Sequence, residues 1–141
     1  MYTNILIAVD LSPRSNQVIE KAQTAASNSG HQLHLVHVVE PLGFANSGDV
    51  PIDFSGVLSD LQKHAQQRLL ELGAQHSIVE DNIHLLVGKA ESEIHRLTKE
   101  LNADLIVVGS TGRHGIALLF GSITDGVVNS ANCDVLAVRI L

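Results

Sequence analysis

The sequence predicts an α/β fold, a single doubly wound five-stranded parallel sheet with helices on both faces. Two observations predict it. Aliphatic runs without polar alternation recur along the chain, as in strands that are buried on both faces. Segments with apolar residues at helical spacing separate these runs, which is typical of parallel sheets. The 141 residues are 45% hydrophobic but only 3% aromatic. We therefore expect residues 1–141 to form one domain with an aliphatic core.

The first expected strand is the aliphatic run from Ile5 to Val9. Ser12 and Pro13 follow after a short turn, and they suit the N-cap and the first position of a helix. This helix is expected to reach about residue 28, and Gly30 ends it. The second strand is expected over residues 33–39.

Residues 40–55 form one long irregular segment, which is either a functional lid or simply mobile. A helix over about 57–72 is expected next, and Gly73 breaks it. A third strand over 83–87 and a helix over 90–101 follow, and Glu91, Glu93 and Lys99 of that helix are expected to face water.

A glycine-rich stretch follows the fourth expected strand, residues 105–108. It is Gly109-Ser110-Thr111-Gly112-Arg113-His114-Gly115, and Gly121-Ser122 then opens a helix to about residue 131. Glycines and the unpaired N–H groups of a helix start bind oxyanions well, so a phosphorylated ligand is expected. The stretch is not a Walker P-loop, since no Lys-Ser/Thr follows the glycines. It is not the dinucleotide fingerprint either, which would open the first helix.

The expected site lies where ligands bind in open parallel sheets, at the carboxyl ends of strands where the strand order reverses. The first strand ends at Asp10 and the fourth at Gly109. If these two strands are neighbours, Asp10 faces the glycine loop.

The composition argues against several partners. A net charge of −6 and a pI near 5.7 disfavour nucleic acids and anionic membranes. No apolar run approaches the ~20 residues that span a bilayer, and no basic region precedes the first strand as in a signal peptide. The single cysteine, Cys133, excludes an internal disulfide and suits a cytoplasmic location. Because it precedes an apolar strand, we expect it to be a small buried hydrophobe.

Eight histidines raise the question of a metal site. His31, His34 and His37 recur every three residues, but His34 and His37 point to opposite faces of a strand. We therefore expect no metal to be bound by these histidines. His114 would need a positioned nucleophile to act as a general base, and none can be named.

The last strand, expected over 135–140, ends the chain as an apolar edge. Its apolar residues are Val135, Leu136, Val138, Ile140 and Leu141, and only Arg139 adds a charge. Exposed edges of this kind are usually covered or paired, so we expect a homodimer built partly on this strand.

The chain resembles the universal stress protein family over nearly its whole length. The similarity rests on four stretches: Ile5-Leu6-Ile7-Ala8-Val9-Asp10-Leu11-Ser12, Leu35-Val36-His37-Val38, residues 104–113, and Gly121-Ser122 with the ending Cys133-Asp134-Val135-Leu136-Ala137-Val138. The resemblance implies strand order 3-2-1-4-5 and commonly a homodimer. It also implies two subgroups, of which one binds ATP through a Gly-x2-Gly-x9-Gly-Ser/Thr motif and the other does not bind it.

This chain carries the glycines of that motif with one residue fewer. Eight residues, rather than nine, separate Gly112 from Gly121-Ser122. The deletion shortens the reach of the loop by up to about 3.5 Å, which is enough to misplace a phosphate contact. Gly115 adds freedom that can absorb the loss, and the balance favours nucleotide binding.

The nucleotide site is expected to comprise Asp10, Val38, Gly109, Gly112, Arg113, Gly121 and Ser122. Asp10 orients the nucleotide directly or through Mg²⁺, or it only forms a turn with the N–H groups near Ser12. Val38 walls the adenine, as the resemblance implies, or is plain core. The glycines and Ser122 hold phosphates, or serve as strand exit, turn and N-cap. Arg113 pairs with phosphate, or is solvated.

The function expected from the resemblance is that of a cytoplasmic stress-response protein. It binds ATP, with Mg²⁺, and acts as a nucleotide-dependent switch or dimeric adaptor. We do not expect an enzyme, because no base or activated nucleophile accompanies the glycine loop. Two alternatives stay open, a dimer that works through protein contacts without nucleotide and a slow ATPase or nucleotidyl-transfer enzyme.

Overall fold

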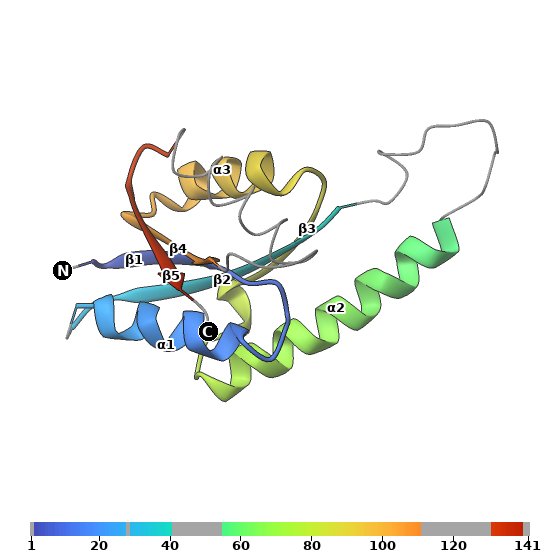
Figure 1. The fold of residues 1–141 in the computed structure, drawn as a ribbon, viewed down its shortest axis with the longest axis horizontal. Helices are drawn as coiled ribbons and strands as arrows, with labels where there is room; N and C mark the ends of the chain where they lie inside the picture. The colour runs from blue at the N-terminus through green and yellow to red at the C-terminus, as the bar shows by residue number, and fades with distance from the viewer. Residues whose placement is uncertain (1, 28, 41–54, 111–130, 140–141) are drawn as a thin grey trace.

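The protein is seen in a computed structural model that describes residues 2–27, 29–40, 55–110 and 131–139 (Figure 1). Five parallel strands form one sheet in the order β3-β2-β1-β4-β5. The strands are β1 (Asn4–Ala8), β2 (Gln32–Val39), β3 (Ile83–Val87), β4 (Leu105–Ser110) and β5 (Asp134–Arg139). This confirms the predicted fold class and the strand order that the resemblance implied.

Three α-helices and a 3₁₀ turn lie on the sheet in the described part of the chain. They are α1 (Ser15–Ala25), α2 (Ser55–Gln75), η2 (Glu80–Asn82) and α3 (Ala90–Leu101). Figure 1 shows α1 and α2 together on one face and α3 on the other. None of these helices is long and apolar enough to cross a membrane.

The central strand β1 is buried on both faces, which explains its continuous aliphatic sequence. Ile5 and Ile7 belong to the core cluster that α1 and α2 cover. Leu6 and Ala8 belong to the cluster under α3. Alternate residues of one strand therefore supply two cores.

The sheet reverses its strand order between β1 and β4, as the site prediction required. Ala8 pairs with Val36 of β2 on one side and with Val108 of β4 on the other. The carboxyl ends of β1 and β4 are thus neighbours, and this is the switch point at which ligands bind in open α/β sheets.

At the opposite, amino edge of the sheet, Asp104 joins the starts of β1 and β4. Its Oδ2 accepts hydrogen bonds from Thr3 N (2.9 Å) and Thr3 Oγ1 (3.2 Å), and its Oδ1 accepts one from Asn4 N (2.9 Å). The Asp104 N–H donates to Asn4 O at 2.8 Å. Both carboxylate oxygens are therefore occupied.

The predicted start of the first helix is wrong by two residues. The helix begins at Ser15, and its N-cap residue, Arg14, makes no side-chain cap. The Asp10 carboxylate accepts hydrogen bonds from Ser12 N and Ser15 Oγ, which holds Ser12 and Pro13 in the preceding turn. A side chain before the turn therefore sets the helix start. The helix also ends at Ala25, ahead of Gly30.

Gly73 does not break the second helix, which continues through it to Gln75. A Cβ at this position would lie 2.4 Å from Ile83 Cδ1. A side chain at Gly73 would force Ile83 to move, so the glycine allows close packing of α2 on β3, a tertiary contact that the sequence does not reveal.

The remaining boundaries are close to the predicted ones, and those of β3 and α3 are the same. Of the irregular segment expected over 40–55, residues 41–54 lie outside the described residues, and Ser55 already begins α2. Residues 122–130 of the last expected helix also lie outside them.

Candidate functional site

Asp10 lies at the carboxyl end of β1, beside the switch point. Its Oδ1 accepts hydrogen bonds from Ser12 N (2.9 Å) and Ser15 Oγ (3.1 Å). The turn-forming role of Asp10 is thus confirmed.

The second carboxylate oxygen of Asp10 is in a different situation. Within the described part of the chain, no hydrogen bond reaches Oδ2. The side chain is half-exposed. An ionised carboxylate has about four lone-pair sites, so Asp10 can hold its turn and still bind a hydroxyl group or a cation.

Val38 lies near the end of β2, on the face that α3 covers. It pairs with Leu86 of β3 and packs, half-buried, against the cluster that contains Ala8 and Val36. The plain-core role is confirmed. The adenine contact stays a prediction.

Gly109 is buried at the end of β4, one residue beyond the pairing of Val108 with Ala8. On its other side it pairs with Val138 of β5. The structure thus brings Asp10 and Gly109 to the same edge of the sheet, on neighbouring strands. The other four predicted residues, Gly112, Arg113, Gly121 and Ser122, lie outside the described residues, as does His114.

Two residues beside this edge were not singled out as site residues from the sequence. His37 Nδ1 makes a hydrogen bond to Val9 O at 2.8 Å, and Arg68 Nη2 donates one to Leu11 O. Arg68 comes from α2, so its contact depends on tertiary structure. The period of β2 places His37 on the face opposite Val38, but no sequence signal links it to Val9.

The protonation state of His37 follows from its partner. A carbonyl oxygen only accepts, so Nδ1 carries the proton. Burial lowers the pKa of His37 below 6.5, while the bond to Val9 and the charge of Asp10 oppose this shift. The neutral ring with its proton on Nδ1 is therefore the favoured form near neutral pH.

A cleft of about 160 Å³ lies between the turn that leads into α1 and the C-terminal half of α2. Its lining includes Ser12, Asn16, Arg68 and Glu71. Ligand pockets usually measure roughly 300–1,000 Å³. The cleft is too small for a nucleotide, and none of its lining residues is a predicted site residue.

His34 and His37 lie on opposite faces of β2, as predicted. His34 is paired with His84 of β3, with 3.4 Å between His34 Nδ1 and His84 Nε2. No three metal-ligating side chains converge in residues 2–27, 29–40, 55–110 and 131–139. Cys133 is half-buried against the α3-side core, and burial raises the pKa of its thiol.

Comparisons with known proteins agree with the fold. Residues 1–139 match the Universal stress protein family. Universal stress protein A homolog 2 of Coxiella burnetii is 41% identical over 143 residues, covering 99% of this chain and 96% of the relative.

Two solved structures share the fold over nearly their whole length. Hypothetical protein MJ0577 superposes with a TM-score of 0.77 at 22% identity, covering 100% of this chain and 98% of the other. A universal stress protein in complex with cAMP superposes with a TM-score of 0.57 at 25% identity, covering 97% and 96%. By fold and by sequence, this chain belongs to the universal stress protein family.

Proposed function

We propose that this chain is a stress-response protein that binds ATP at the carboxyl ends of β1 and β4 and acts as a switch or dimeric adaptor. The observation that carries the proposal is the position of Asp10, which lies at the switch point and holds its turn with one carboxylate oxygen only. The similar protein in complex with cAMP gives further support, because a nucleotide binds that relative.

The proposed contacts divide between the two strands. Asp10 and Val38 bind the nucleoside, and Gly109 begins the loop that binds the phosphates. Gly112, Arg113, Gly121 and Ser122 supply the remaining phosphate contacts. Gly109 is buried at the end of β4.

Mg²⁺ fits this arrangement only together with the nucleotide. Asp10 Oδ2 is one available oxygen ligand, and Mg²⁺ is commonly held by one or two carboxylates plus phosphate oxygens. Bound there, the ion would neutralise phosphate charge. Asp10 would hold it, and phosphate oxygens of the nucleotide would supply further ligands.

We propose binding without turnover. His37 lies beside Asp10, and its Nδ1 proton binds the Val9 carbonyl, which leaves Nε2 as the basic nitrogen. The proposal therefore rests on the sequence, in which no activated nucleophile accompanies the glycine loop. A slow ATPase remains the outcome to test against. Phosphate release at a stoichiometric excess of MgATP distinguishes the two.

Calorimetry with MgATP tests the site. The wild-type protein should bind, Asp10→Ala should weaken binding by at least about tenfold, and Gly112→Val should abolish it, since valine adds bulk and resists positive φ. Asp81→Asn is the matched control, since Asp81 is exposed at the other edge of the sheet. No heat and no thermal shift with millimolar MgATP would contradict the proposal.

We also propose a homodimer through β5, in a cytoplasmic protein. β5 is the outermost strand on its side of the sheet, and Leu136 on it is 36% exposed. One detail of the expected apolar edge is wrong, because Val138 is buried in the core between α1, α2 and the sheet. Light scattering should give a dimer for the wild type and a monomer for Leu136→Lys. A dimer that binds no nucleotide would favour the adaptor function.

A further inference from the structure

The peptide that precedes Asp10 is held from the side by β2. β1 ends at Ala8, yet the Val9 N–H donates to Val36 O at 3.0 Å. The Val9 carbonyl receives its hydrogen bond from the His37 side chain, at 2.8 Å. An imidazole thus supplies the donor where the ladder between β1 and β2 has ended.

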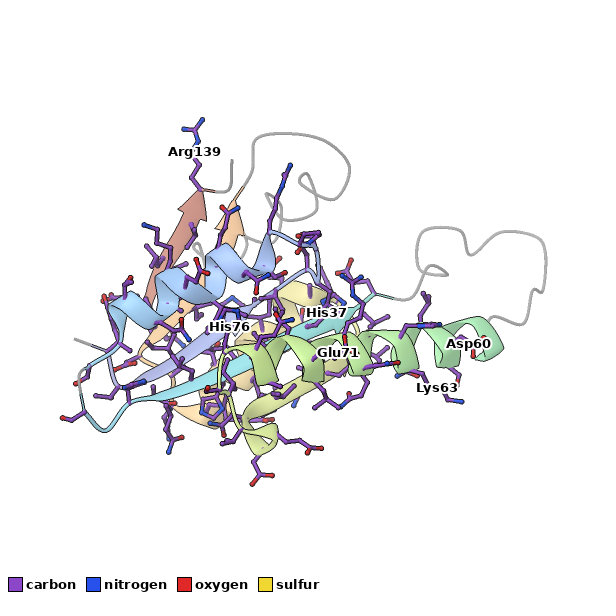
Figure 2. All side chains as sticks on the ribbon, turned by 90° about the horizontal axis from the view of Figure 1, so that it is seen from below. His37, Asp60, Lys63, Glu71, His76 and Arg139 are labelled. Atoms are coloured by element: carbon purple, nitrogen blue, oxygen red, sulfur yellow. The ribbon has the colours of Figure 1, made fainter. Side chains whose placement is uncertain are left out.

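His37 is well suited to fix this carbonyl. It belongs to β2, in register with Leu85 of β3, so its backbone is part of the sheet. The side chain is half-buried on the face that α1 and α2 cover (Figure 2). A ring on an interior strand of the sheet loses little entropy when it forms one more contact.

We infer that His37 is a positioning residue for the Asp10 carboxylate. The Val9 carbonyl and the Asp10 N–H belong to one planar peptide group. By fixing this plane, His37 fixes the Asp10 N–Cα bond, which together with φ sets the direction in which the Asp10 side chain leaves the backbone. This inference rests on the proposed function, since it assigns the nucleotide-binding geometry of Asp10 to a residue that does not touch the nucleotide.

The chain beyond Asp10 shows why such a tether is needed. Leu11 has a φ of 64°, in the left-handed region that a branched side chain rarely adopts. Arg68 of α2 binds the carbonyl of Leu11, and Asp10 Oδ1 binds Ser12 N. These contacts act after Asp10, whereas His37 acts on the peptide before it.

Asparagine and glutamine substitutions at position 37 distinguish this positioning role from general packing. Asparagine places its NH₂ group near the position of Nδ1, whereas glutamine places it near Nε2. Because the bond uses Nδ1, His37→Asn should retain it, and His37→Gln and His37→Leu should lose it. His76→Leu is the matched control, because His76 binds Asn16 through Nε2 elsewhere on the same face (Figure 2).

The first measurement does not depend on nucleotide. Amide hydrogen exchange of Ser12 reports the bond to Asp10 Oδ1, and that of Ile106 in β4 reports global opening. Relative to Ile106, the Ser12 amide should exchange at least about tenfold faster in His37→Leu and His37→Gln. His37→Asn and His76→Leu should resemble the wild type. Unchanged Ser12 exchange in His37→Leu, or equal loss in His37→Asn, would overturn the inference.

The second measurement is the affinity for MgATP. His37→Leu should bind about tenfold more weakly, and His37→Asn should restore the affinity. If the wild type binds no MgATP, the proposed function fails, and Ser12 exchange still decides whether His37 positions Asp10. If the wild type binds and His37→Leu binds equally well, the positioning role is wrong and the proposed function stands.

Discussion

The two edges of the sheet use aspartate in different ways. Asp104, at the amino edge, accepts three hydrogen bonds through both carboxylate oxygens. Asp10, at the carboxyl edge, accepts two through a single oxygen. A carboxylate whose oxygens are both engaged by the chain joins two strands, whereas a half-engaged carboxylate can also bind a ligand. The difference separates a structural aspartate from a candidate functional one.

The same substitution at both edges gives the largest expected effects. Asp104→Ala leaves the N–H groups of Thr3 and Asn4 without their acceptor. We expect a loss of about 2 kcal/mol in the free energy of unfolding, a low value for charge-assisted bonds because the carboxylate is partly solvated. Asp10→Ala should cost about 1 kcal/mol. Urea unfolding at pH 7 measures both.

Binding should show the opposite order at the two edges. Asp104→Ala should keep its affinity for MgATP, and Asp10→Ala should lose it. A similar loss of stability in both variants, with binding intact in both, would remove the distinction between the edges.

The pKa of Asp104 adds a pH dependence to this edge. Burial alone would raise this pKa, but the hydrogen bonds from Thr3 and Asn4 lower it below 3.8. The folded pKa is then below the unfolded one, so Asp104 stabilises the protein above about pH 4. This contribution should disappear as the pH falls through the folded pKa, and Asp104→Ala should abolish it.

Two glycines of α2 extend the comparison to packing. α2 runs from the carboxyl side of the sheet to the amino side, with Gly56 at its start and Gly73 near its end (Figure 1). A Cβ on Gly73 would meet Ile83 Cδ1 at 2.4 Å, whereas a Cβ on Gly56 would meet nothing within 4 Å. Gly73→Ala should cost about 1–2 kcal/mol by overpacking. Gly56→Ala should stabilise the protein by up to about 0.5 kcal/mol. Thermal unfolding of both variants compares them, and a gain at Gly73 would show that Ile83 repacks freely.

These features also show what sequence reasoning reaches. The sheet and the span of α3 were predictable because buried parallel strands and amphipathic helices have distinct apolar periods. The start of α1 was not predictable, since the Asp10 side chain sets it. The continuity of α2 was not predictable either, since Gly73 serves close packing against Ile83 and does not end the helix. Asp10 was identified by its place after a strand. His37 was missed because its contact with Val9 joins two strands 28 positions apart.

Histidines also differ between the two ends of β2. His37, toward the carboxyl end, binds a backbone carbonyl, whereas His34, nearer the amino end, binds another titratable ring, His84. Burial lowers the pKa of His34, and the charge of His84 lowers it further. Burial also lowers the pKa of His84, which Glu100 partly opposes. Only one nitrogen of the facing pair can carry the shared proton.

The His34–His84 pair should make the protein less stable in mild acid. Both folded pKa values lie below 6.5, so the unfolded chain binds more protons. The contribution of these two histidines to stability is fully present above about pH 6.5, and it is lost as the pH falls toward their folded pKa values. The urea midpoint should decrease from pH 7.5 to 5.5. His84→Gln keeps a donor near Nε2 without titrating and should decrease less. Equal decreases in both proteins would mean that other groups set this slope.

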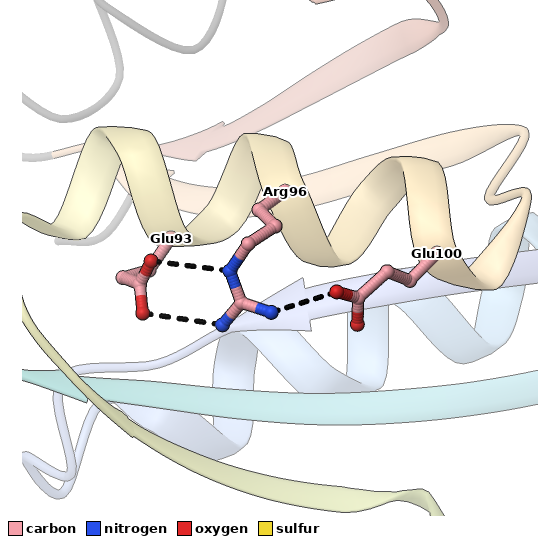
Figure 3. Close-up of polar contacts among 3 residues, drawn as sticks. All are labelled: Glu93, Arg96 and Glu100. Carbon is pink, nitrogen blue, oxygen red and sulfur yellow. Dashed lines mark hydrogen bonds and ion pairs between the residues drawn. The ribbon is translucent and has the colours of Figure 1, made fainter.

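The smallest effect is expected from carboxylates that bind within one helix. On α3, Arg96 joins Glu93 (3.2 Å) and Glu100 (2.7 Å), as Figure 3 shows. The Arg96 side chain is 48% exposed, and all three residues are neighbours along the helix, so the ion pairs connect no separate parts of the chain. Solvent and salt screen such pairs. Arg96→Met, which keeps the length of the side chain and its helix propensity, should change Tm by no more than about 2 °C. Adding salt to the wild type should have a similarly small effect.

If Arg96→Met instead lowers Tm as much as Asp104→Ala does, the stability of this fold depends on the number of bonds that a carboxylate makes. The distance along the chain that those bonds span would then be unimportant, and the contrast between the two edges would lose its physical basis.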